Sequence, residues 1–218
     1  MVLPALFQDN LLPEAELPAG QGLEAIADPG NRSATVDMKM CPQCVSNWCW
    51  AAVAVSVTRL LYPGSTWTQC LLATRVFFTE GLRPPDCCVE SNKSTSDCNH
   101  EAGLDLALYT TGALANTKAQ TPPDGDTLYT ELSNGRPVAC QVNWIGTTEN
   151  HFVAIVGYHR VGTDERVDIL DPAYPPTTGV LLNSFLNNYC PLNSPTSASW
   201  KTTYFTQKPA VDTNLSGP

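Results

Sequence analysis

Residues 46–64 read SNWCWAAVAVSVTRLLYPG, and this stretch decides the fold. Ser46 or Asn47 is suited to cap a helix over residues 48–62, and the Pro-Gly pair that follows ends it. Apolar side chains surround this helix almost completely, whereas a helix at a protein surface keeps one polar face. The stretch therefore predicts a helix that is buried in the middle of the protein.

Helical patterns fill the first half of the chain, and strand patterns fill the second half. Further helices are expected over residues 68–78, 101–111 and 126–132, with a cysteine-rich loop at 81–99. Runs rich in valine and isoleucine predict strands at 138–144, 151–159 and 166–170, and weaker patterns extend the sheet to 174–182 and 200–205. Helices followed by strands indicate an α+β protein in which a helical lobe packs against an antiparallel sheet lobe.

The same patterns divide the chain into segments. Residues 1–38 have weak periodicity and are predicted to be an N-terminal arm or pro-segment. The folded domain is expected over residues 39–208, with the helical lobe at 39–135 and the sheet lobe at 136–208. Residues 209–218 are predicted to be a loose tail. A functional site is expected in the cleft between the two lobes.

Charge and hydropathy exclude several classes of partner. The 218 residues include 12 Lys plus Arg and 21 Asp plus Glu, which gives a net charge of −9. Nucleic acids and anionic membranes are bound by basic surfaces, so we expect neither as a partner. No apolar run approaches the roughly 20 residues that a membrane span needs. We expect a monomer.

Nine cysteines are many for a reduced cytosolic protein of this length. Eight of them can pair and leave Cys49 as the odd one, which is typical of a disulfide-stabilised protein with one reactive thiol. The favoured pairing joins Cys70 to Cys87 or Cys88, and Cys98 within the same loop, whereas buried thiols are the alternative. Secretion or export is therefore expected, although the N-terminus lacks the basic start of a signal peptide.

Cys49 is the candidate nucleophile. It lies in the first turn of the predicted central helix, where unpaired backbone N–H groups and the positive end of the helix dipole favour a thiolate. Its own N–H is suited to stabilise an oxyanion. Gln43, six positions earlier, carries a side-chain amide that is suited to be the second donor. A lone cysteine in an apolar helix is more often structural, but this pattern supplies both the helix start and the donor.

His151 is the candidate base, and Asp171 is the candidate group that orients it. His151 opens the apolar run HFVAIVGY, whereas His100 lies in a polar loop and His159 ends the same strand too far away to share a site. Asp171 ends the neighbouring strand and precedes a proline, so it can also begin a turn. Asp168 is the competitor, but strand alternation places it on the opposite face, where solvent is expected.

At these residues the sequence resembles the papain-like cysteine peptidases. Gln43, Cys49 and Trp50 match the oxyanion-hole and nucleophile pattern of that family, although the Cys-Gly-Ser that precedes the nucleophile in papains is absent. A strand opened by histidine and a strand ending in aspartate match His151 and Asp171. The nucleophile segment and sheet lobe are most similar to small bacterial papain-like peptidases, including avirulence-effector and C39-like peptidases, over residues 41–175. The residues around Cys70, Cys87, Cys88 and Cys98 resemble an insertion in some of these proteins.

The resemblance implies a papain-like fold and peptide-bond hydrolysis through a thioester. Cys49 would attack as a thiolate, His151 would protonate the leaving amine, and Asp171 would orient the histidine. Gln43 would bind the oxyanion, and Trp144 would border the substrate cleft. The implied partner is a peptide or protein substrate, and no metal or cofactor is needed.

Three other functions are compatible with part of this pattern. An acyltransferase or transglutaminase uses the same three groups but delivers the acyl group to an amine. A zinc-binding interaction module would use Cys41 and Cys44 together with Cys87, Cys88 and Cys98. A catalytically inactive relative would keep the fold for binding alone.

Overall fold

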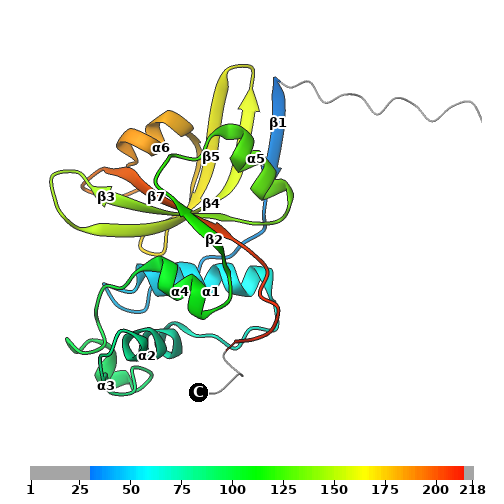
Figure 1. The fold of residues 1–218 in the computed structure, drawn as a ribbon. Coiled ribbons are helices and arrows are strands. Elements are labelled where there is room, and N and C mark those ends of the chain that lie inside the picture. Colours follow the sequence, from blue (N-terminus) through cyan, green and yellow to red (C-terminus); the bar gives the residue numbers. More distant parts are fainter. Residues whose placement is uncertain (1–29, 214–218) are drawn as a thin grey trace, which may run out of the picture.

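The helix expected at residues 48–62 is α1 (Cys49–Leu61), and it is the buried centre of a computed structural model that describes residues 30–213. Every residue from position 49 to 58 is buried. Helices α2 (Gln69–Thr79) and α4 (Leu104–Thr110) and strand β4 (Asn150–Val161) pack against α1. In Figure 1, α1 lies directly beneath the sheet, and α2 lies on the side of α1 that faces away from it.

One antiparallel sheet contains the seven strands of the described residues. Six of them follow the order β2-β7-β3-β4-β5-β6. The strands besides β4 are β2 (Leu114–Ala119), β3 (Val138–Trp144), β5 (Asp164–Leu170), β6 (Thr177–Leu181) and β7 (Ala198–Thr206). The seventh strand, β1 (Asn31–Thr35), pairs with the second half of β4, beyond the part of β4 that pairs with β3. The predicted combination of a helical lobe and an antiparallel sheet lobe is confirmed.

Helices cover both faces of this sheet. The helical lobe with α1 lies against one face, and α5 (Gly125–Ser133) and α6 (Leu182–Asn188) pack against the other. Because both faces of β4 are buried, its sequence is a continuous apolar run rather than an alternation of apolar and polar residues. Within residues 30–213, no helix has the length and apolar character needed to cross a membrane.

Several segments differ from the sequence-based expectation. β1 lies inside the predicted N-terminal arm, and β2 and the short helix α3 (Glu90–Lys93) were not predicted. The strand expected at 174–182 covers only residues 177–181, and α6 begins at the next residue. The remaining part of the predicted arm, up to residue 29, lies outside the described residues, and the division into segments stays a prediction.

The C-terminal residues that were expected to be loose are anchored as far as residue 213. The backbone N–H of Thr66 donates to the Asp212 carboxylate at 2.8 Å, and the indole of Trp67 donates to the Thr213 hydroxyl at 3.0 Å. Asp212 is only 7% exposed. These bonds join the last described residues to the segment between α1 and α2. The rest of the predicted tail lies outside the described residues.

Two disulfides fasten the loop between α2 and α4. Cys70 is bonded to Cys88, and Cys87 to Cys98, which is one of the patterns favoured from the sequence. The expectation of four disulfides is wrong, because the remaining five cysteines are free: Cys41, Cys44, Cys49, Cys140 and Cys190. Cys140 is fully buried in β3, and burial raises the pKa of its thiol to about 12, so it behaves as a small apolar side chain.

We expect peptide mapping of unreduced protein to recover these two bridges and five alkylated cysteines. Reduction before denaturation should lower the free energy of unfolding by about 2–4 kcal/mol for each bridge, because each bridge closes a short loop of the unfolded chain. Urea unfolding with and without a reductant measures this difference. A map that joins other cysteines, or equal stability in the two conditions, would contradict the expectation.

Candidate active site

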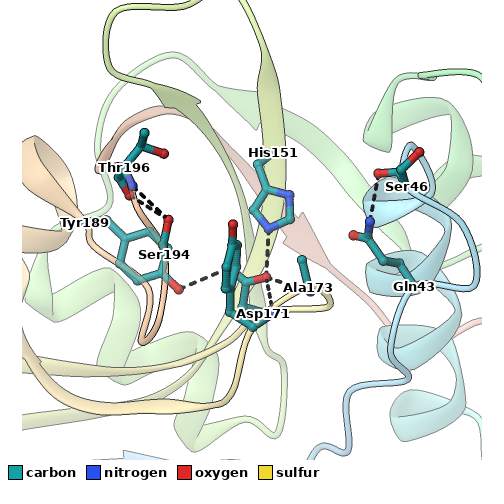
Figure 2. A network of polar contacts seen from close by, with 9 residues as sticks. Gln43, Ser46, His151, Asp171, Ala173, Tyr189, Ser194 and Thr196 are labelled. Carbon is teal, nitrogen blue, oxygen red and sulfur yellow. Dashed lines mark hydrogen bonds and ion pairs between the residues drawn. The ribbon is translucent and has the colours of Figure 1, made fainter.

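His151 and Asp171 form a buried pair where β4 begins and β5 ends. The Nε2 atom of His151 lies 2.8 Å from Oδ1 of Asp171, and the two side chains are 6% and 0% exposed. Asp171 Oδ1 also accepts from the backbone N–H groups of Ala173 and Tyr174, and Oδ2 accepts from the Tyr189 hydroxyl at 3.2 Å. The carboxylate thus begins a turn and holds the histidine at the same time, as Figure 2 shows.

Cys49 and His151 line the same cleft. Burial lowers the pKa of the imidazolium, but hydrogen bonds to Asp171 and Cys49, together with their charges, outweigh burial and raise the pKa of His151 to about 9. Because Nε2 is taken by Asp171, Nδ1 is the nitrogen that remains for the thiol. In Figure 2 this second nitrogen points away from Asp171, toward the side where Gln43 and Ser46 lie.

Aromatic rings screen the histidine. The ring of Trp144 is stacked on that of His151, with centroids 5.4 Å apart, and Tyr174 meets both rings edge-on. Trp144 ends β3 and lines the same cleft as Cys49 and His151. The indole therefore limits the access of water to the hydrogen bond between His151 and Asp171.

The start of α1 carries no side-chain cap among the described residues, contrary to the prediction for Ser46 and Asn47. The capping position is occupied by Trp48, which makes no such bond. Both predicted caps contact Asn99 instead: the Ser46 hydroxyl accepts from its amide, and the Asn47 amide donates to its carbonyl oxygen. The backbone N–H groups of the first turn therefore stay available beside Cys49 for an anionic ligand.

Gln43 lies at the junction of the two lobes. Its backbone N–H donates to the carbonyl oxygen of Pro172, the residue after Asp171, at 3.0 Å. One hydrogen of its Nε2 is donated to the carbonyl oxygen of Ser46 at 2.7 Å, and Oε1 is buried with no partner among the described residues. An amide nitrogen has two hydrogens, so one donor remains next to the start of α1.

A cleft of about 450 Å³ opens over Cys49 and His151. One wall comes from the start of α1 and from α4 with the segment before it, and the other comes from β2, β3, β7 and the start of β4. Its floor contains a polar chain in which the Tyr204 hydroxyl donates to Gln141, whose amide donates to Asn150. The site expected between the two lobes thus corresponds to a real cleft.

The other two histidines are separate from this cleft. His159 receives the Ser33 hydroxyl at Nδ1 and lies 2.7 Å from Asp168 through Nε2. Asp168 was expected to be solvated, but its side chain is only 19% exposed, and it also accepts from the backbone N–H of Gly179. His100 is exposed, as expected, and its ring meets Phe77 edge-on.

The zinc-site alternative lacks its ligands. Cys87, Cys88 and Cys98 are consumed by the two disulfides. Within the part of the chain that the structure describes, no three His, Cys, Asp or Glu side chains gather as a metal site.

Two contributors to the site were not found from the sequence. Tyr189 follows α6 and reaches the Asp171 carboxylate, and Asn99 bridges the half-cystine loop to the start of α1. Neither residue lies in a recognisable motif. Their roles depend on distant segments meeting in the fold, so only an arrangement in space could have revealed them.

A comparison with protein families agrees with this geometry. The family described as Peptidase_C39 like family matches residues 35–197, which is well over half of the chain and includes Cys49, His151 and Asp171. A search of curated proteins finds no match.

Proposed function

Because the chain belongs to the Peptidase C39-like family, we propose that it is a cysteine peptidase in which Cys49, His151 and Asp171 form the catalytic triad. The family implies a peptide or protein substrate. The observation that supports the triad best is that the His151 imidazole is bonded to the Asp171 carboxylate and lines the same cleft as Cys49. This is the order of groups that nucleophilic acyl transfer requires.

The first half-reaction forms a thioester. The Cys49 thiolate attacks the scissile carbonyl carbon, and the developing oxyanion is bound by the Cys49 backbone N–H and the remaining Nε2 hydrogen of Gln43. The protonated His151 then gives its proton to the leaving amine as the carbon–nitrogen bond breaks. Asp171 keeps Nε2 occupied, so that the exchanged proton is the one on the nitrogen facing the sulfur.

The second half-reaction returns the enzyme to its starting state. Neutral His151 removes a proton from water, the resulting hydroxide attacks the thioester carbonyl, and the carbon–sulfur bond breaks to release the acid and the thiolate. The Trp144 ring forms part of the substrate-binding surface beside this water. An amine that enters the same position would give acyl transfer, which is the alternative outcome.

Labelling by an epoxide inhibitor of thiol peptidases tests the proposal. We expect one modified residue, Cys49, in mass spectra of the digested protein, while the exposed Cys44 and Cys190 stay unmodified. The reason is that only Cys49 has both a histidine and an oxyanion site beside it. Equal labelling of several cysteines would contradict the proposal. The absence of labelling at Cys49 would favour a catalytically inactive relative.

The acceptor is identified by product analysis. A peptide substrate incubated with and without an added primary amine should give the free acid in both cases, because the cleft admits water to the thioester. An amide product that dominates when the amine is present would instead assign the chain to the acyltransferases.

A further inference from the structure

We propose that Glu101 and Glu149, on opposite walls of the cleft, select substrates with a basic side chain next to the scissile bond. This inference rests on the proposed function, since it concerns the substrate of the same site. Both glutamates line the cleft that contains Cys49 and His151. Glu101 belongs to the segment between α3 and α4, and Glu149 to the hairpin between β3 and β4.

The segment that carries Glu101 is fixed relative to the nucleophile. The indoles of Trp48 and Trp50, on either side of Cys49, donate to the carbonyl oxygens of Cys98 and His100 at 2.7 and 3.2 Å. Asn99, between these two residues, bonds to the backbone and side chain of Asn47. The disulfide to Cys87 anchors the same segment covalently. Glu101 follows directly, so its backbone is held beside the site and its exposed side chain starts from there.

Glu149 is fixed relative to the histidine. It lies two positions before His151 in the turn that joins β3 to β4. Its backbone N–H donates to the Thr147 hydroxyl at 3.1 Å, and its carbonyl oxygen accepts from the backbone N–H of Trp144, whose ring covers His151. The backbone of Glu149 is therefore also held, on the side of the cleft formed by the sheet.

The other charges in the cleft are paired with neighbours, and the Cys49 thiolate of the proposed mechanism adds a negative charge. Asp105 and Lys118 form an ion pair at 2.6 Å, and the His151 imidazolium is paired with Asp171. The carboxylates of Glu101 and Glu149 are thus the side-chain carboxylates of the cleft lining that make no ion pair among the described residues. They attract a lysine or arginine side chain and repel an acidic one, and the net charge of −9 adds a field of the same sign.

A matched set of peptidyl epoxides tests this selectivity. Three probes share one peptide sequence and differ only in a Lys, Gln or Glu residue next to the epoxide, and the rate of Cys49 modification is followed by mass spectrometry. We expect the lysine probe to react about two- to fivefold faster than the glutamine probe, which is the effect of one partly exposed ion pair, and the glutamate probe to react slowest. About 1 M salt should reduce the differences.

Variants assign the preference to the two carboxylates. The ratio of lysine to glutamine rates should fall in E101Q and in E149Q and approach unity in the double variant. E80Q, which removes an exposed carboxylate at the end of α2, should keep the ratio of the unsubstituted protein. Equal rates for the three probes, or an unchanged ratio in the double variant, would overturn the inference while leaving Cys49 as the nucleophile. If no probe modified Cys49, the proposed function itself would be wrong.

Discussion

Replacement of Cys49 by alanine is expected to abolish peptide hydrolysis, with a loss of at least about a thousandfold in kcat/KM, because no other group in the cleft can form the thioester. Epoxide labelling should vanish in the same variant. His151→Ala should cause a comparable loss of hydrolysis and strongly reduced labelling, since the sulfur loses its proton acceptor and the leaving amine its proton donor. Initial rates with a peptide substrate measure both effects.

The chain offers matched controls for these two variants. Cys190→Ser alters an exposed thiol, and His100→Ala alters an exposed histidine, so neither should change the rate of hydrolysis. The pair Cys49→Ala and His151→Ala should also lose no more activity together than Cys49→Ala alone, because the two groups act as a unit. Full activity in Cys49→Ala would disprove the assignment of the nucleophile.

Substitution of Asp171 should affect both stability and activity. In Asp171→Ala, the His151 ring, two backbone N–H groups and the Tyr189 hydroxyl lose their acceptor in a buried site. We expect the free energy of unfolding to fall by about 3–5 kcal/mol, as in other broken buried pairs. Asp171→Asn keeps an acceptor oxygen in the same place and should retain most of the stability. Urea unfolding compares the two variants, and equal stability would contradict this account of the turn.

The pH dependence of hydrolysis shows whether Asp171 acts on His151 by its charge or only by orienting the ring. The raised pKa of His151, about 9, predicts that hydrolysis falls as the pH rises through 9, because the leaving amine then lacks a proton donor. Asp171→Asn removes one of the charges that raise this pKa, so the alkaline limb should move to lower pH by about one unit. A profile that keeps its midpoint would mean that the carboxylate only supports the turn.

The same group links stability to pH. Because the pKa of His151 is higher in the folded chain than its ordinary value of 6.5, the proton stabilises the folded state fully below pH 6.5. This contribution is lost as the pH rises from 6.5 through about 9. Asp171→Asn should reduce the contribution, since the carboxylate charge is part of its cause.

The elements that were predictable are those whose own sequence carries a strong pattern. α1 is apolar all round, and the first half of β4 is a continuous apolar run, so both were recognised together with Cys49 and His151. β2 reads LANTKA and has weak strand propensity, but it pairs with β7. α6 reads LNSFLNN and is held by the burial of Leu182 and Phe185. In both elements the tertiary contacts outweigh the local preference.

The candidate site shows the same division. Cys49, Gln43, His151 and Asp171 have positions that a motif can specify, whereas the contacts of Asn99 and Tyr189 arise only when the segments meet. The caps expected at Ser46 and Asn47 were wrong for this reason, because Asn99 competes for both side chains. The prediction that the eight cysteines other than Cys49 all form disulfides was wrong, because the number of cysteines does not tell which thiols become neighbours in the fold.

The segment at residues 98–100 is held by a disulfide, whereas the neighbouring Cys49 needs a free thiol, so the two groups require opposite redox conditions. Cys49 must stay reduced to react, so a cysteine peptidase is usually handled with a thiol reductant. The bridge between Cys87 and Cys98 must stay oxidised, because three carbonyl groups that contact Asn47, Trp48 and Trp50 belong to the residues it anchors. A buffer that protects the nucleophile therefore loosens the wall beside it, and the protein should work best in a narrow interval of redox potential.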